Sequence, residues 1–199
     1  MRSIGLSVLC CAAFVSAVSA QQAPMGRGQA PQPRPLPGIV MEVRAIFNNI
    51  KNNITKAADQ FPEDKYGWSP TPDVRTWGGL MSHIVDDNNG ACFTLSGDTG
   101  TPPPRLDNAG KPIEAGRNLK KTDIVKLLAE SFARCDKAFD AVNETNMAER
   151  NGNTNRSKFG AVFYDTQHIN EHYGNIVTYM RLQGMVPPSS APRGGGPAN

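Results

Sequence analysis

The sequence predicts an all-α protein, an up-and-down four-helix bundle, and three observations lead to this expectation. Four stretches of about 20 residues carry apolar side chains at intervals of three and four, the spacing that places them on one face of a helix. No stretch alternates apolar and polar residues as a strand would, and no internal repeat is visible. Four amphipathic helices of this length can bury one sizeable core, which we place within residues 39–188.

The first two predicted helices lie before residue 96. The first runs from about Ile39 to Gln60 and is followed by Pro62. The second opens at 71–73, where Thr71 is a good N-cap and Pro72 suits the first helical position. The apolar faces are formed in the first by Val40, Val43, Ile46, Phe47, Ile50 and Ile54, and in the second by Trp77, Leu80, Met81, Ile84, Val85, Ala91, Cys92 and Leu95.

The third and fourth predicted helices follow a Gly- and Pro-containing loop at 97–118. The third starts at Thr122, and the fourth starts near Ser157 and ends where Gly184 can act as its C-terminal cap. Their apolar faces contain Ile124, Leu127, Leu128, Cys135, Phe139 and Val142 in the third, and Phe159, Val162, Phe163, Ile169, Tyr173, Ile176, Val177 and Met180 in the fourth.

Both ends of the chain look different from the bundle. Arg2, an apolar run at 4–15 and small residues at 18–20 predict a secretory signal peptide, residues 1–20, cut near Ala20. Residues 21–38 are rich in Pro, Gln and Gly and predict a disordered linker; residues 189–199 predict a disordered tail. We therefore expect an exported protein, periplasmic or secreted, with no membrane span.

The mature chain keeps two of its four cysteines, because Cys10 and Cys11 lie in the signal peptide. Cys92 and Cys135 fall on the apolar faces of the second and third helices. Two buried free thiols are one interpretation. In an exported protein we favour the other, a disulfide that joins these two helices.

The chain contains three histidines, and all three fall in predicted helices. His168 and His172 are four residues apart, hence about 40° apart around the helix axis, so both imidazoles can reach one point. They lie at the edge of the apolar face of the fourth helix, and His83 lies at the corresponding edge of the second. A single histidine at such an edge is usually a solvated or hydrogen-bonded side chain, but the pair with His83 suggests a shared metal site.

Three imidazoles with an open position suit a divalent metal ion, Zn²⁺, Ni²⁺ or Fe²⁺. Asp87 and Asp165 lie near the histidines along their helices and could orient the imidazole N–H groups, although exposed helix carboxylates are equally common. Glu171 could act as a base, but a surface position is the simpler interpretation. We assign no catalytic residue.

Residues 168–172 also spell H-x-x-E-H, the inverted zinc-protease motif. That motif needs a third, acidic ligand downstream, and no Asp or Glu follows Glu171. The protease interpretation is therefore weak, and His83 is the better third ligand.

Two segments resemble the DinB-like (DinB/YfiT) family of metalloenzymes. The run EHYGNIVTYMRLQGMVPPSS, which begins at Glu171, resembles the closing helix of exported members, and PTPDVRTWGGLMSHIVDDNNGACF resembles the helix that carries the first histidine of the family. The resemblance covers most of residues 39–190. It implies an up-and-down four-helix bundle with a three-histidine divalent metal site, whose ligands are His83, His168 and His172 in this chain. Family members are often homodimers.

The resemblance implies a metal-dependent hydrolase or a thiol or group transferase that acts on a small molecule. Low-molecular-weight thiols are mainly cytoplasmic, so predicted export argues against thiol transfer. The first alternative is a non-catalytic exported bundle that binds metal or a partner, for example in envelope stress, and the second is a structural bundle with incidental histidines. The formal net charge is +3 with both signs mixed along the chain, which gives no basic surface typical of nucleic-acid binding.

Overall fold

The computed structural model describes residues 37–106 and 119–192. Within these ranges four helices form a bundle, α1 (Ile39–Gln60), α2 (Trp77–Cys92), α3 (Lys121–Asp140) and α4 (Lys158–Leu182). Two short 3₁₀ helices follow along the chain: η1 (Glu63–Lys65) comes after α1, and η3 (Pro188–Ser190) comes after α4. No strand occurs in the described ranges, which contain one isolated bridge between Arg150 and Ser157. The all-α prediction is confirmed; the predicted signal peptide and most of both predicted tails lie outside the described residues.

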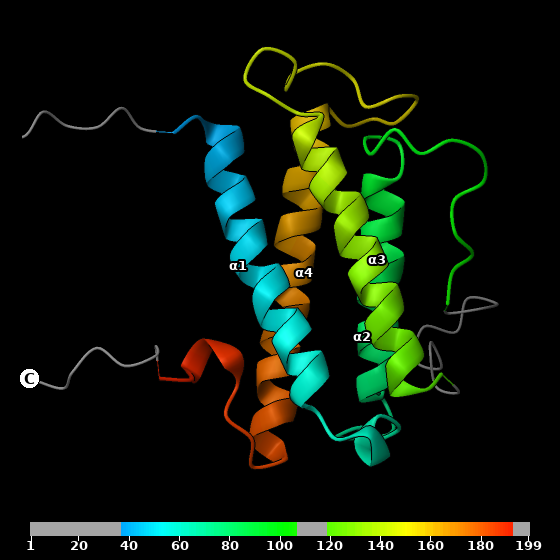
Figure 1. The fold of residues 1–199 in the computed structure, drawn as a ribbon, viewed down its shortest axis with the longest axis vertical. Helices are drawn as coiled ribbons and strands as arrows, with labels where there is room; N and C mark the ends of the chain where they lie inside the picture. Colours follow the sequence, from blue (N-terminus) through cyan, green and yellow to red (C-terminus); the bar gives the residue numbers. More distant parts are fainter. Residues whose placement is uncertain (1–36, 107–118, 193–199) are drawn as a thin grey trace, which may run out of the picture. The chain divides into compact units, whose positions relative to one another are not determined.

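The order of helix directions differs from the simple up-and-down order that we expected. In Figure 1, α1 and α4 run one way and α2 and α3 run the other. The start of α2 accordingly meets the start of α3: a Cβ at Gly78 would lie 3.1 Å from Cδ1 of Ile124. The connection between α2 and α3, residues 93–120, is long enough to return along the bundle. As a result α2 packs against α3 and α4, and α1 packs against the same two helices from the other side.

Two of the four predicted helix starts need correction. Helix α2 begins at Trp77 and not at Thr71, because Thr76 is its N-cap and accepts a hydrogen bond from the backbone N–H of Gly79. Helix α3 begins at Lys121, with no side-chain cap, so Thr122 is inside the helix.

The predicted ends of α4 are confirmed. The Ser157 hydroxyl accepts a hydrogen bond from the N–H of Gly160 at the start of the helix. At the other end Gly184 has a φ of 71°, and the next N–H, of Met185, donates to the carbonyl of Met180 at 2.9 Å. This is the left-handed glycine turn that closes many helices.

The core follows the predicted apolar faces with two exceptions. Ile46 and Phe163 are 55% and 51% exposed, although their spacing placed both on apolar faces. Where α1 gives way to α2, Phe61 stacks on Trp77 with ring centroids 3.7 Å apart, and both side chains are fully buried. This aromatic pair anchors the start of α2 and thereby fixes the position of His83, which lies six residues further on.

The predicted disulfide is present. Cys92, the last residue of α2, is bonded to Cys135 of α3, and both are fully buried. The bond joins the two parallel helices close to the end of α2.

No helix in the described part of the chain is long and apolar enough to cross a membrane.

Candidate metal centre

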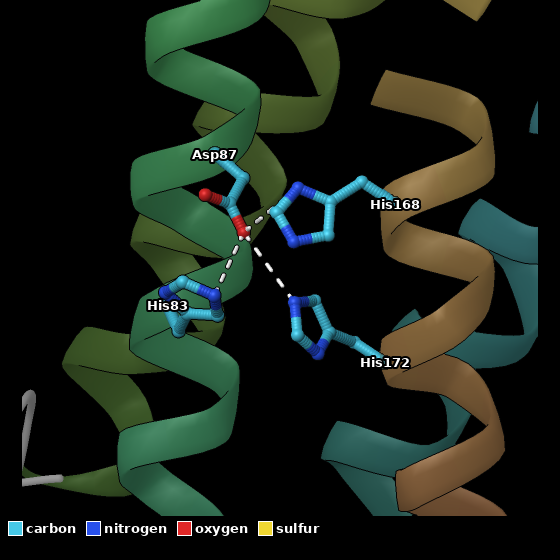
Figure 2. Close-up of side chains that lie close together, drawn as sticks. All are labelled: His83, Asp87, His168 and His172. Carbon is cyan, nitrogen blue, oxygen red and sulfur yellow. Dashed lines mark ion pairs between the residues drawn. The ribbon is translucent and has the colours of Figure 1, made fainter. Parts of the chain in front are cut away.

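The three histidines lie together between α2 and α4, and His168 and His172 share one helix face, as their spacing predicted. His83 lies on α2, and His168 and His172 lie one turn apart on α4 and face it (Figure 2). The ring centroid of His172 is 4.6 Å from that of His83 and 4.7 Å from that of His168. One nitrogen of each ring can therefore approach a common point.

The carboxylate of Asp87 lies beside that point. Its Oδ2 atom is 3.2 Å from Nε2 of His83, 3.7 Å from Nε2 of His172 and 3.8 Å from Nδ1 of His168. Figure 2 shows the carboxylate between the rings and not behind them. Asp87 is one turn after His83, so both side chains leave α2 toward α4. It is thus a candidate fourth ligand. We name these four residues the histidine–aspartate cluster.

The chemistry of the cluster fits a divalent metal ion. Its four candidate ligand atoms all lie within 4.8 Å of one another. Nδ1 of His83, both ring nitrogens of His172 and Oδ2 of Asp87 are buried with no hydrogen-bond partner among the described residues. Buried polar atoms are nearly always paired. Imidazole and carboxylate are common ligands of Zn²⁺ and related ions, so a bound ion would satisfy the atoms that face one another.

The pKa values of three cluster residues favour the protonation states that bind a cation. Burial lowers the pKa of His83 to about 3, with the nearby positive charge of Arg75 as the second cause. Burial likewise lowers the pKa of His172 to about 4, and the neighbouring His168 contributes. Neutral imidazole is the form that binds metal, so neither ring has to lose a proton first at neutral pH. Burial raises the pKa of Asp87 to about 6, so this carboxyl is still largely ionised at pH 7.

A cavity of about 260 Å³ opens beside the cluster, between α2 and α4. Asp87 and His168 form part of its wall, so a small molecule in the cavity would contact the cluster. The loop between α3 and α4 covers one side with Asn151, Thr154 and Arg156. The arrangement therefore combines candidate metal ligands with space for a second molecule.

Asp165 does not orient an imidazole, contrary to our expectation. Its side chain is buried, its Oδ1 has no hydrogen-bond partner among the described residues, and its Oδ2 lies 3.8 and 3.6 Å from the sulfur atoms of Cys92 and Cys135. The sulfurs form a disulfide and carry no hydrogen, so they cannot donate to the carboxyl. Burial, and to a smaller extent the negative charge of Asp87, raises the pKa of Asp165 to about 8. At neutral pH Asp165 is mainly protonated.

Asp165→Asn is expected to change how stability depends on pH. The unfolded chain releases this proton near the ordinary aspartate pKa of 3.8, and the folded chain holds it until about pH 8. Between these values the unfolded state binds fewer protons, so the contribution of Asp165 to the free energy of unfolding falls as pH rises. Asparagine cannot ionise. We therefore expect urea denaturation of metal-free protein to show that the free energy of unfolding of the variant, relative to that of the native chain, increases from pH 4 to pH 8. The increase should reach a few kcal/mol.

The exposed Asp73→Asn variant is the control for this experiment, since it removes a carboxylate with little burial. If the difference in the free energy of unfolding between Asp165→Asn and the native protein is constant across this pH range, Asp165 is not a buried, protonated carboxyl.

Three further polar residues of α4, Glu171, Tyr179 and Arg181, are not part of the cluster. Glu171 is exposed, in agreement with a surface role. The hydroxyl of Tyr179 donates to the carbonyl of Arg75 at 2.9 Å and its ring packs against Trp68, which ties the segment before α2 to α4. Arg181 reaches Ser190 beyond the end of α4. The spacing of four residues between His83 and Asp87 was a usable signal for Asp87, but no feature of the sequence shows that its carboxylate lies near all three rings.

Comparison with known proteins agrees with this architecture. Residues 47–176 match the DinB superfamily. A crystal structure described as the conserved protein of locus from Enterococcus faecalis has the same fold: it is 15% identical, its TM-score is 0.58, and the match covers 74% of this chain and 98% of that one. No curated protein matches the sequence significantly. Members of the matched family bind metals. Because the match spans well over half of its residues, this chain belongs to the DinB superfamily.

Proposed function

We propose that this protein is an exported, divalent-metal-dependent enzyme in which His83, His168 and His172 hold the metal and Asp87 is a fourth ligand. The observation that carries the proposal is the convergence of three imidazole nitrogens on Oδ2 of Asp87 at the wall of a cavity. Zn²⁺, Ni²⁺ or Fe²⁺ are the ions that such ligands favour. The reaction class that fits is hydrolysis or group transfer on a small molecule.

Each residue of the cluster has a defined task in this proposal. When bound, the ion would polarise a substrate oxygen or acidify a water molecule. His83 and His172 supply neutral lone pairs at neutral pH, because burial keeps both rings unprotonated. Asp87 supplies negative charge that offsets part of the charge of the ion. His168 is the most exposed of the three rings, at 23% of its side chain, and borders the cavity where substrate would lie.

Two observations support export. The N-terminal 20 residues have the pattern of a signal peptide, and disulfides such as Cys92–Cys135 persist mainly in oxidising compartments. If the proposal is right, protein recovered from the periplasm or medium of the native cell has the mass of a chain that begins at Gln21.

The activity is tested with metal-reconstituted protein on a panel of ester, amide, phosphoester and thiol-transfer substrates. We expect turnover of at least one class that requires the metal and is abolished in His83→Ala, since loss of one ligand disables the site. Glu171→Ala, an exposed change on the same helix as two ligands, should keep full activity. Metal bound at one equivalent with no turnover of any class would favour the non-catalytic metal-binding bundle.

A further inference from the structure

An exposed cationic side chain lies on the cavity wall next to the histidine–aspartate cluster. The guanidinium carbon of Arg156 lies 3.9 Å from the ring centroid of Tyr164, and the ring of Tyr164 is 5.5 Å from that of His168. All three side chains line the same cavity. The positive charge of Arg156 is thus separated from the cluster by a single aromatic ring.

The loop that carries Arg156 is ordered by its own hydrogen bonds. The N–H of Asn151 donates to the carbonyl of Arg156 at 2.9 Å, and the hydroxyl of Thr154 donates to the carbonyl of Asn151 at 2.8 Å. The N–H of Arg156 in turn donates to the Thr154 hydroxyl. The turn orders the backbone of Arg156, and the cation–π contact restricts its guanidinium before any ligand binds, so less entropy is lost when a ligand does bind.

Arg156 has no carboxylate partner within residues 37–106 and 119–192. The acidic residues of the cavity are directed elsewhere: Asp86 accepts the N–H of Leu106 at 2.9 Å, Asp87 faces the histidines, and Asp165 is buried against the disulfide. The guanidinium of Arg156 is therefore available to an anionic group in the cavity.

An independent observation also points to a ligand in this cavity. Asn151 lines it and is 4% exposed, yet its Oδ1 has no hydrogen-bond partner in the described part of the chain. Leaving such a group unpaired costs roughly 1–3 kcal/mol. A ligand that carries an N–H or O–H donor and reaches this buried oxygen would supply the missing partner.

We infer that the cavity binds a small substrate that carries a carboxylate, which is held by Arg156 while the reacting end of the molecule faces the histidine–aspartate cluster. The inference rests on the proposed metal site and adds the substrate class. The cavity volume of about 260 Å³ restricts the ligand to a small molecule. A guanidinium can hold a carboxylate by two parallel hydrogen bonds, which a neutral group of the same size cannot form.

Two hydroxamates test the inference, because both bind a divalent ion through the same head group. Succinate monohydroxamate ends in a carboxylate, and butyrohydroxamate ends in a methyl group. We expect calorimetry on the zinc-loaded full chain to show roughly tenfold tighter binding of the carboxylate probe, the order expected for one charge-assisted hydrogen-bonded pair. Arg156→Gln should bring the ratio close to one, and Arg156→Lys should retain part of it.

Arg181→Gln is the matched control, since it removes the same charge at the far end of α4, beside Ser190. It should leave the ratio unchanged. Equal affinity of both probes for the native protein, or a ratio that survives Arg156→Gln, overturns the inference while the metal site stands. A chain that retains no zinc and binds neither probe refutes the proposed function, and the inference falls with it.

Discussion

His172→Ala is expected to lower the affinity for Zn²⁺ by at least about 100-fold. Loss of a residue that only orients a ligand lowers metal affinity by about 10- to 100-fold, and loss of a ligand itself should lower it at least as much. His172 is the most buried imidazole of the cluster, and both of its ring nitrogens lack a partner. Its loss leaves two imidazoles and one carboxylate. Competition titration against a chromogenic chelator measures the change.

The comparison variants separate ligands from neighbours. Glu171→Ala alters the adjacent exposed residue and should leave the affinity unchanged. Asp87→Asn keeps the size of the side chain and removes its charge, so it should weaken binding more than Glu171→Ala and less than His172→Ala. An affinity in His172→Ala equal to that of the native chain would remove this residue from the site.

Loss of the Cys92–Cys135 disulfide is expected to produce the largest change in stability. The bond closes a loop with a sequence separation of 43 residues. In the chain-entropy account a loop of this length contributes about 4 kcal/mol to the free energy of unfolding. The Cys92→Ala/Cys135→Ala double variant should therefore unfold at a clearly lower urea concentration, and its helices should still form at low temperature.

A reductant provides the control for the disulfide. Dithiothreitol should lower the urea midpoint of the native chain toward that of the double variant, and the midpoint of the double variant should not respond. Intact mass with and without reductant reports the bond directly. Two alkylatable thiols in protein isolated from an oxidising compartment would contradict the assignment.

The sequence predicted most of the bundle because apolar spacing follows burial closely in four separate helices. It was wrong at Ile46 and Phe163, whose spacing places them near the edge of an apolar face, where the neighbouring helix decides whether a side chain is covered. It was also wrong at Thr71, because two good caps lie close together and the packing of Trp77 on Phe61 selects Thr76. The parallel direction of α2 and α3 has no signal in the sequence, because the residues between the two helices show no periodic pattern.

Part of the candidate site was predictable, because it too depends on the spacing of residues along a helix. Residues four apart share a helix face in any packing, so the pairing of His168 with His172 needed no structure. The inward direction of Asp87 and the position of Asp165 against the disulfide depend on which helices are neighbours. Arg156 lies in a loop, and only the folded chain shows its contact with Tyr164.

The three-histidine metal site is tested by metal analysis of the full mature chain, purified without a histidine tag and reconstituted with Zn²⁺. We expect one equivalent per chain and X-ray absorption spectra with three imidazole nitrogens in the first coordination sphere. Less than about 0.2 equivalents after reconstitution, or spectra without imidazole ligands, would contradict it.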